Sequence, residues 1–187
     1  MNVDARVFRD TLGRFASGVV VVTGADAAGP AGLTCQSFFA VSLDPPLVAV
    51  CPSLKSVSWR RIEATGAFAV SVLAAHQREL CLTFGQGGQK DKFAAAGWEP
   101  APSGAPFIHD ALAWLDCAIA AVHPAGDHVL VVGEVRHLTA RDGDPLLFHR
   151  GGFGTFSSRV LASVGTAGAS AANEVWGEGP WQEGVDW

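Results

Sequence analysis

The stretch that best suits the binding of an anion runs from Cys51 to Trp59, with the sequence Cys-Pro-Ser-Leu-Lys-Ser-Val-Ser-Trp. It carries three hydroxyls and one ammonium where an apolar strand is expected to give way to a helix. A helix N-terminus favours a phosphate, because its first amides have no partner within the helix and its dipole is positive there. An ordinary capped helix with a solvated lysine also explains the pattern, and the local sequence slightly favours that second interpretation.

Two further stretches suit a flat ligand and a polar contact to it. Gly32-Leu-Thr-Cys-Gln-Ser37 sets a glycine beside small polar residues, so that a backbone can approach a planar group closely. A strand with a polar outer face is the simpler explanation. Gly126-Asp127-His128 lies at an expected turn, where a histidine can donate or accept a hydrogen bond near neutral pH. Alternatively, Gly and Asp make the turn and His128 merely begins the next strand.

Other common chemistries lack their sequence signatures. The glycine clusters match neither a P-loop nor a dinucleotide-binding fingerprint, and no serine lies in a GxSxG elbow. The histidines show no ligand spacing, and the cysteines show neither a CxxC nor a pairing pattern, so they are expected to be small buried hydrophobes. We therefore predict no metal site and no residue acting as catalytic acid, base or nucleophile.

Composition narrows the class of protein further. The 187 residues include 13 Lys and Arg against 18 Asp and Glu, a net charge of −5, so no basic excess favours nucleic acid. No apolar run approaches the roughly 18 residues that span a bilayer. Residues 1–9 mix acids and bases without an apolar region, which argues against a signal peptide. We expect a cytoplasmic protein that binds neither nucleic acid nor membrane.

The elements that would position these residues are mostly strands. Apolar and β-branched runs predict strands at 19–22, 32–42, 47–51, 67–73, 111–123, 128–138 and 146–149. Helices are predicted at 4–16, 56–65 and 76–84, with a long loop over 85–106. Strands separated by turns, with few helices, favour a mainly β fold, a β-barrel with peripheral helices, over a βαβ sheet. Residues 1–156 would form this domain. Residues 157–187 would form a Ser/Ala/Gly-rich linker and an acidic tail with three tryptophans.

Taken in order, several stretches resemble the short-chain flavin reductases, the reductase components of two-component flavin-dependent monooxygenases. They are residues 8–23, 32–38, 42–48, 55–62, 92–93, 113–117, 126–128, 133–135 and 145–151. The resemblance implies a split β-barrel of the FMN-binding type with short peripheral helices, usually a homodimer. It also implies hydride transfer from NADH, or alternatively NADPH, to FMN or FAD. The reduced flavin would then pass to a separate oxygenase.

The same resemblance implies a role for each matching residue. Around the flavin ring and ribityl chain it places Thr34, Cys35, Gln36 and Ser37. Near the flavin phosphate it places Ser53, Lys55, Ser56 and Trp59, and at the far side of the pocket Lys92 and Phe93. His128 would meet the nicotinamide of NADH. Two positions depart from the family, which often has Ala at position 35 and Asn or Ser at position 36.

A hydride donor and acceptor that react directly need mainly to be stacked, with backbone amides near the ring to stabilise its negative charge. This explains why no catalytic constellation is visible, and it gives His128 an orienting or binding role. Two alternatives stay open: a non-catalytic flavin-binding barrel, and a haem-binding barrel with His128 or His149 as ligand.

Overall fold

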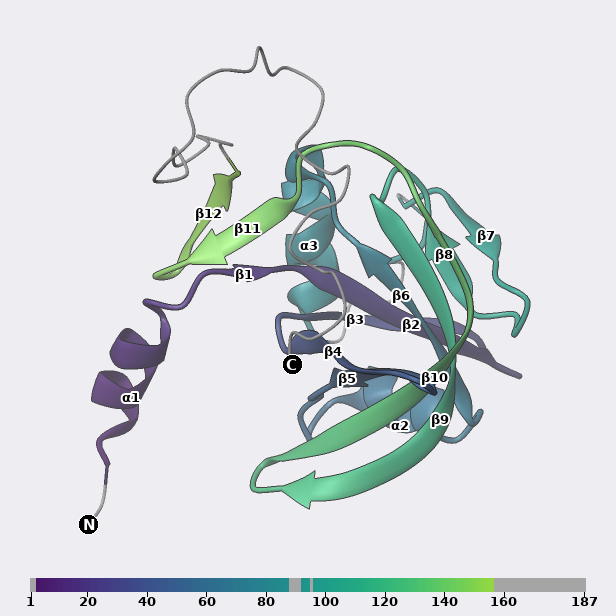
Figure 1. Cartoon of the computed structure of the whole chain (residues 1–187), viewed down its shortest axis with the longest axis horizontal. Coiled ribbons are helices and arrows are strands. Elements are labelled where there is room, and N and C mark those ends of the chain that lie inside the picture. Colours follow the sequence, from purple (N-terminus) through teal and green to yellow (C-terminus); the bar gives the residue numbers. More distant parts are fainter. Residues whose placement is uncertain (1–2, 88–91, 95, 157–187) are drawn as a thin grey trace, which may run out of the picture. The chain divides into compact units, whose positions relative to one another are not determined.

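The computed structural model describes residues 3–87, 92–94 and 96–156. Its helices are α1 (Ala5–Leu12), α2 (Val57–Glu63), the short 3₁₀ helix η1 (Ala75–Gln77) and α3 (Arg78–Gly85). Its strands are β1 (Ser17–Gly18), β2 (Val20–Asp26), β3 (Gly29–Cys35), β4 (Phe38–Leu43), β5 (Pro46–Val50), β6 (Ala67–Val72), β7 (Trp98–Pro100), β8 (Pro106–Ile108), β9 (Ala113–Ala125), β10 (His128–Ala140), β11 (Leu146–His149) and β12 (Gly152–Thr155). Strands dominate, which confirms the predicted mainly β class with a few short helices (Figure 1).

Seven strands form one antiparallel sheet in the order β3-β2-β6-β9-β10-β5-β4. Its two edge strands, β3 and β4, are joined by only Gln36 and Ser37. At about 3.6 Å per residue, so short a connection holds the joined strand ends within about 11 Å of each other. The sheet therefore has to curl until its edges approach, which makes it a barrel that is split between β3 and β4.

The core lies on both faces of β2. Val20 and Val22 pack inside the barrel, whereas Val19 and Val21 pack against the outer layer that includes α3. All four valines are at most 2% exposed. The prediction that the valine run forms a strand buried on both faces is confirmed.

Helix α2 covers the barrel interior and is tied to the β2–β3 hairpin. Trp59 and Ile62, three residues apart on one face of the helix, are buried with the interior strands. The Arg61 guanidinium donates to both carboxylate oxygens of Asp26, Nε to Oδ2 at 2.8 Å and Nη2 to Oδ1 at 2.5 Å. Nη2 also donates to the carbonyl of Gly29 at 2.7 Å. This bidentate pair fixes the helix, and the loop before it, on the sheet.

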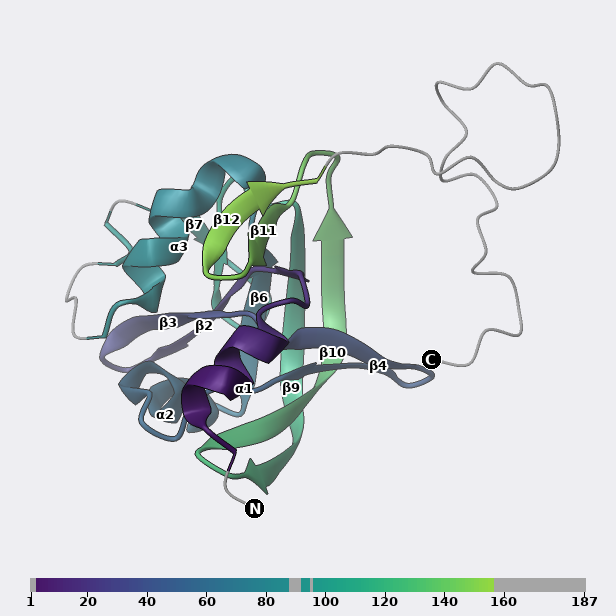
Figure 2. The same ribbon diagram turned by 90° about the vertical axis from the view of Figure 1, so that its left-hand side faces the viewer.

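Helix α1 differs from the prediction in length and in burial. It spans Ala5–Leu12 rather than 4–16, with Asp4 as its N-cap, and none of its residues is buried. Its predicted apolar face stays open, because Phe8 is 53% and Leu12 56% exposed. Figure 1 shows α1 standing apart from the seven-stranded sheet, and Figure 2 shows it below the β11–β12 hairpin.

Other differences concern strands. The strand predicted over 32–42 is broken at Gln36–Ser37 into β3 and β4. Four short strands, β1, β7, β8 and β12, were not predicted, and β7 lies within the stretch 85–106 that was expected to be a loop. Segment 157–187, predicted to be a linker and tail, lies outside the described residues. Within the part of the chain that is described, no helix is long and apolar enough to cross a membrane.

The Asp26–Arg61 pair predicts a pH dependence of stability. The hydrogen bonds from Arg61 lower the pKa of Asp26 from 3.8 to about 2. The pair therefore stabilises the fold fully above pH 3.8, and this contribution is lost as the pH falls towards 2. We expect Asp26→Asn to lower the melting temperature at pH 7, and the difference from the wild type to shrink between pH 4 and pH 2.

The matched control for this measurement is Asp10→Asn. Asp10 pairs with Arg6 at 4.0 Å, and both side chains are at least 75% exposed. A surface pair of this kind contributes little. A loss in Asp26→Asn that is no larger than in the control, or that persists unchanged at pH 2, would contradict the role given to the pair.

Candidate flavin and nicotinamide site

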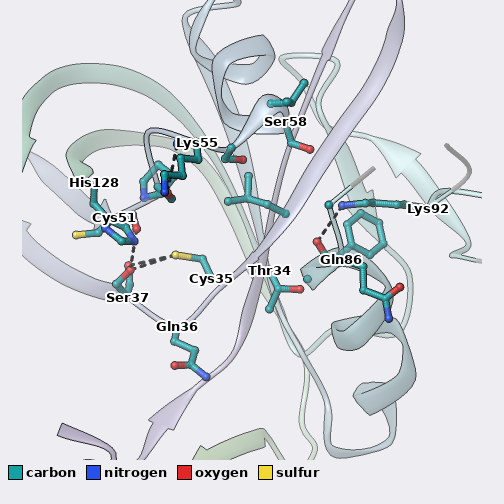
Figure 3. A pocket seen from close by; sticks show the side chains of 18 residues that line it. Thr34, Cys35, Gln36, Ser37, Cys51, Lys55, Ser58, Gln86, Lys92 and His128 are labelled. Atoms are coloured by element: carbon teal, nitrogen blue, oxygen red, sulfur yellow. Dashed lines mark hydrogen bonds between the residues drawn. The ribbon is translucent and has the colours of Figure 1, made fainter. Parts of the chain in front are cut away.

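A pocket of about 710 Å³ opens where β3 passes into β4. Its walls come from that junction, from the loop between β5 and α2, from the end of α3 and from the β9–β10 turn. Its volume falls within the range of small-molecule sites, about 300–1,000 Å³. Figure 3 shows Lys55 and His128 on one side of it, Gln86 and Lys92 on the other, and Cys35 and Gln36 between them.

The pocket gathers most of the residues that the sequence singled out from distant stretches. Nine of the eleven predicted cofactor-binding residues line it: Thr34, Cys35, Gln36, Ser37, Ser53, Lys55, Ser56, Lys92 and His128. The barrel's split brings them together, because the chain segments that carry them meet only where the sheet edges approach.

Two serines of the loop before α2 accept hydrogen bonds from backbone amides of the same segment. The hydroxyl of Ser56 accepts from the amide of Trp59 at 3.1 Å, which caps the helix. The hydroxyl of Ser53 accepts from the amide of Lys55 at 3.3 Å. Within the described residues the Lys55 ammonium has no hydrogen bond or ion pair. The charge of Lys55 helps to lower the pKa of Asp127, and its ammonium can still donate to an anion at this end of the pocket.

The β3–β4 junction is held by side chains that point along the pocket. The Ser37 hydroxyl donates to the carbonyl of Cys51 at 3.3 Å and lies 3.3 Å from the Cys35 sulfur (Figure 3). The Thr34 hydroxyl donates to the carbonyl of Cys81 in α3 at 2.7 Å. Gln36 makes no side-chain hydrogen bond within the described residues, so its amide is available to a ligand.

Lys92 fills the opposite side of the pocket. Its ammonium donates to the carbonyl of Phe84 at 3.0 Å and to that of Gly32 at 3.5 Å, which bridges α3 and β3. Burial lowers the pKa of Lys92, because the charged form loses solvation.

Gly32 lies against α3 in the same region. A Cβ at this position would lie 2.6 Å from the Phe84 ring, so a side chain there would clash. The structure thus gives this glycine a packing role, in place of the close approach to a flat ligand that its sequence suggested.

His128 is the first residue of β10, directly after the turn at Gly126 and Asp127, and lies on the same side of the pocket as Lys55 (Figure 3). Its Nδ1 lies 2.7 Å from a carboxylate oxygen of Asp127, and the hydrogen bond from His128 lowers the pKa of that carboxyl. The hairpin is tied to the loop before α2: the amide of Leu54 donates to the carbonyl of Asp127 at 3.0 Å, and that of Val129 to Pro52 at 3.1 Å. With Nδ1 engaged by Asp127, Nε2 is the ring nitrogen left for a ligand.

Two predicted residues lie outside the lining. Trp59 is 1% exposed, and its ring meets Phe68 edge-on at 6.3 Å in the core. Helical periodicity turns Trp59 and Ile62 to the interior and leaves the serines at the pocket, so the indole does not line it, and a place for Trp59 near a phosphate stays a prediction. Phe93 packs edge-on against Phe84 at 5.0 Å, behind the pocket wall.

Some lining residues were not predicted. They are Leu33, Cys51, Pro52, Val57, Ser58, Phe84, Gly85, Gln86 and Gly87. Cys51, Pro52 and Ser58 belong to the stretch that the sequence marked for anion binding, so that motif already contained the signal. Asp127 was part of the Gly-Asp-His motif but received no role of its own. His149, the alternative haem ligand, is not among the residues that line this pocket.

Burial makes three of the four thiols, those of Cys51, Cys81 and Cys117, poor nucleophiles. Cys35, Cys51, Cys81 and Cys117 are all free. Burial is the main cause that raises the pKa of Cys51 and Cys81, and it raises that of Cys117 to about 12. These three groups are therefore protonated thiols at neutral pH.

Comparison with known proteins identifies the family. Residues 12–157 match the flavin reductase like domain. The chain is 45% identical over 155 residues to the reductase subunit HsaB of a flavin-dependent monooxygenase from Mycobacterium tuberculosis, covering 81% of this chain and 82% of that protein. It is 44% identical over 154 residues to the FMN reductase (NADH) SmoA of Agrobacterium fabrum, covering 82% and 87%.

A solved structure agrees with these relatives. The NADH:FAD oxidoreductase of Streptomyces globisporus, in complex with NAD and FAD fragments, has a TM-score of 0.79 at 38% identity and covers 86% of this chain and 99% of that one. Fold and pocket together define a split barrel of the flavin reductase type. The chain belongs to the flavin reductase like domain family, which confirms the resemblance found in its sequence.

Proposed function

We propose that this protein is an NAD(P)H:flavin oxidoreductase that reduces free flavin and supplies it to a separate oxygenase. The observation that carries the proposal is the pocket itself, which sets the ammonium of Lys55 and the imidazole of His128 beside the polar β3–β4 junction. A flavin with its phosphate at Lys55 and its ring along Cys35 and Gln36 would leave His128 beside the ring. There a nicotinamide can stack.

Flavin and nicotinamide supply the redox chemistry, because the hydride passes directly between their rings. The chain's own task is to bind and orient them. Lys55 supplies charge to a phosphate, and Gln36 has an unused amide for the ring. His128, oriented by Asp127, offers Nε2 to the nicotinamide carboxamide. No side chain has to transfer a proton in the hydride step.

The choice of substrates follows the relatives rather than the pocket. We propose NADH as the favoured donor, since the relative SmoA is named an NADH-dependent FMN reductase. The flavin is FMN or FAD, because SmoA is named for FMN and the Streptomyces protein for FAD. The relative HsaB is the reductase subunit of a monooxygenase, which supports a separate oxygenase as the partner of this chain. A cytoplasmic location fits an enzyme that draws on cellular NADH.

Flavin-dependent oxidation of NADH tests the proposal directly. The purified protein should consume NADH only when FMN or FAD is added, as followed by the loss of NADH absorbance. Riboflavin, which lacks the phosphate, should show a higher KM than FMN, because Lys55 then has no anion to bind. A yellow protein that leaves NADH untouched would indicate a non-catalytic flavin binder, and a Soret band would indicate haem.

His128 is expected to act on the nicotinamide more than on the flavin. We predict that His128→Ala raises the KM for NADH roughly tenfold, the cost of about one good hydrogen bond, while the Kd for flavin changes less than threefold. Steady-state kinetics and a flavin fluorescence titration measure the two quantities. A control, His123→Ala on the neighbouring strand β9, should change neither. Lost flavin affinity with an unchanged NADH KM would refute the assignment.

We also propose that the protein is a homodimer. Strand β4 is an edge of the sheet, and three of its apolar side chains are exposed: Phe39 at 49%, Val41 at 44% and Leu43 at 80%. An exposed apolar edge strand is unfavourable unless another surface covers it. Light scattering should give twice the 19.4 kDa chain mass, and Leu43→Glu should shift the protein towards monomer. A wild-type protein of 19.4 kDa at micromolar concentration would contradict the dimer.

A further inference from the structure

A second hollow, of about 780 Å³, adjoins the flavin pocket at Gln36, which lines both. Its lining comes from α1, from the segment that follows it and from the β11–β12 hairpin, which a hydrogen bond from the amide of Arg150 to the carbonyl of Gly13 ties to the end of α1. Its lining residues are Phe8, Arg9, Asp10, Leu12, Gly13, Arg14, Phe15, Ser17, Gln36, Phe148, Arg150 and Gly151. The hydride chemistry described above uses none of them except Gln36.

Three arginines line this hollow and lack partners. Within the residues that the structure describes, the guanidiniums of Arg9, Arg14 and Arg150 have no hydrogen bond and no ion pair. Most other described arginines, by contrast, pair with a carboxylate, as Arg61 does with Asp26. The one carboxylate in the lining, Asp10, lies 4.0 Å from Arg6 on the same helix. The described lining therefore has three guanidiniums against one carboxylate, which gives the hollow a net positive charge.

Arg150 occupies a backbone position that does not favour arginine. It and Gly151 form the two-residue turn between β11 and β12, and both have positive φ, 50° and 81°. Such a turn favours Asn-Gly or Gly-Gly. The amide of Arg150 donates to the carbonyl of Gly13 at 2.9 Å, a bond that any residue other than proline can make. Neither the conformation of the turn nor this hydrogen bond therefore requires the guanidinium of Arg150.

The apolar part of the lining is aromatic. Phe8 is 53% and Phe15 81% exposed, and Phe148 lies on the hairpin opposite them. Exposed phenylalanines beside guanidiniums suit a ligand that is both flat and anionic, because rings stack and guanidiniums bind phosphate with paired hydrogen bonds. Adenosine phosphates have this combination.

We infer that this hollow binds the adenosine pyrophosphate portion of a dinucleotide, NADH or FAD, whose reacting ring lies in the adjoining pocket. The inference rests on the proposed function. The pocket of about 710 Å³ would hold the two stacked reacting rings, and at Gln36 it meets the second hollow. A dinucleotide whose ring lies in the pocket can therefore extend its adenylate into the hollow. The arginines then meet the pyrophosphate and the phenylalanines meet the adenine.

Two substitutions separate this binding role from a structural one. Arg14→Gln removes one guanidinium. Arg150→Gly removes another and at the same time suits the positive φ of the turn, so its melting temperature should not fall below that of the wild type. Arg136→Gln is the control: it removes one positive charge from strand β10, away from both hollows.

ADP is the direct probe, because it carries the proposed ligand group without either reacting ring. Calorimetric titration should show ADP binding to the wild type and to Arg136→Gln. Each of Arg14→Gln and Arg150→Gly should weaken it roughly tenfold, the usual loss for one charge-assisted hydrogen bond. ADP binding that is absent from the wild type, or equal in all four proteins, would overturn the inference whether or not the protein reduces flavin.

Kinetics with truncated substrates identifies which dinucleotide uses the hollow. If it is NADH, the two variants raise the KM for NADH and leave that for reduced nicotinamide mononucleotide unchanged. If it is FAD, they raise the KM for FAD and leave that for FMN unchanged. Unchanged values for both dinucleotides would overturn the inference, while turnover of FMN with reduced nicotinamide mononucleotide continues to report on the proposed function. A wild type that reduces no flavin with any donor is a failure of that function alone.

Discussion

The connection of β3 to β4 through two residues is the constraint on which the rest of the site depends. Because the joined strands are opposite edges of a seven-stranded sheet, the sheet must curl, and its split opens where Gln36 and Ser37 lie. Curling also brings the end of β5 and the β9–β10 hairpin to the same place, since β5 lies between β4 and β10 in the sheet. Residues that are about 90 positions apart, such as Gln36 and His128, then line one pocket.

Hydrogen bonds between main-chain groups keep that meeting point in register. The loop before α2 is bound to the hairpin on one side, from Leu54 to Asp127 and from Val129 to Pro52. On the other side, α2 is held on the sheet by Arg61 and Asp26. A shift of α2 would therefore be transmitted to His128. The group expected to bind phosphate and the group expected to bind nicotinamide are positioned as one unit, which a reaction between stacked rings requires.

The sequence was sufficient for features set by local pattern and insufficient for those set by closure of the barrel. The four valines of 19–22 and the long strands of the second half follow from periodicity alone. The break at Gln36–Ser37 does not, because no glycine or proline marks it. It arises because β3 pairs back with β2 whereas β4 pairs forward with β5, at the opposite edge of the sheet. The burial of Trp59, by contrast, could have been predicted, since Trp59 and Ile62 are spaced to share one face of the helix; its expected place near a phosphate came from the family resemblance. Nine of the eleven predicted site residues nevertheless gather, because the family motifs recorded long-range contacts that physical patterns do not.

Several hydroxyls of the pocket form hydrogen bonds within the protein, and this affects the residence time of a bound flavin. Thr34 donates to α3, Ser37 donates to Cys51, and Ser56 caps its own helix. Such groups shape the wall and have less hydrogen bonding left for a ligand, so we expect most of the specific attraction to come from Lys55, Gln36, His128 and the backbone. Few strong anchors mean fast dissociation. For a protein whose product has to diffuse away to a second enzyme, a short residence time is a working property, and tighter binding would slow each cycle at the step of release.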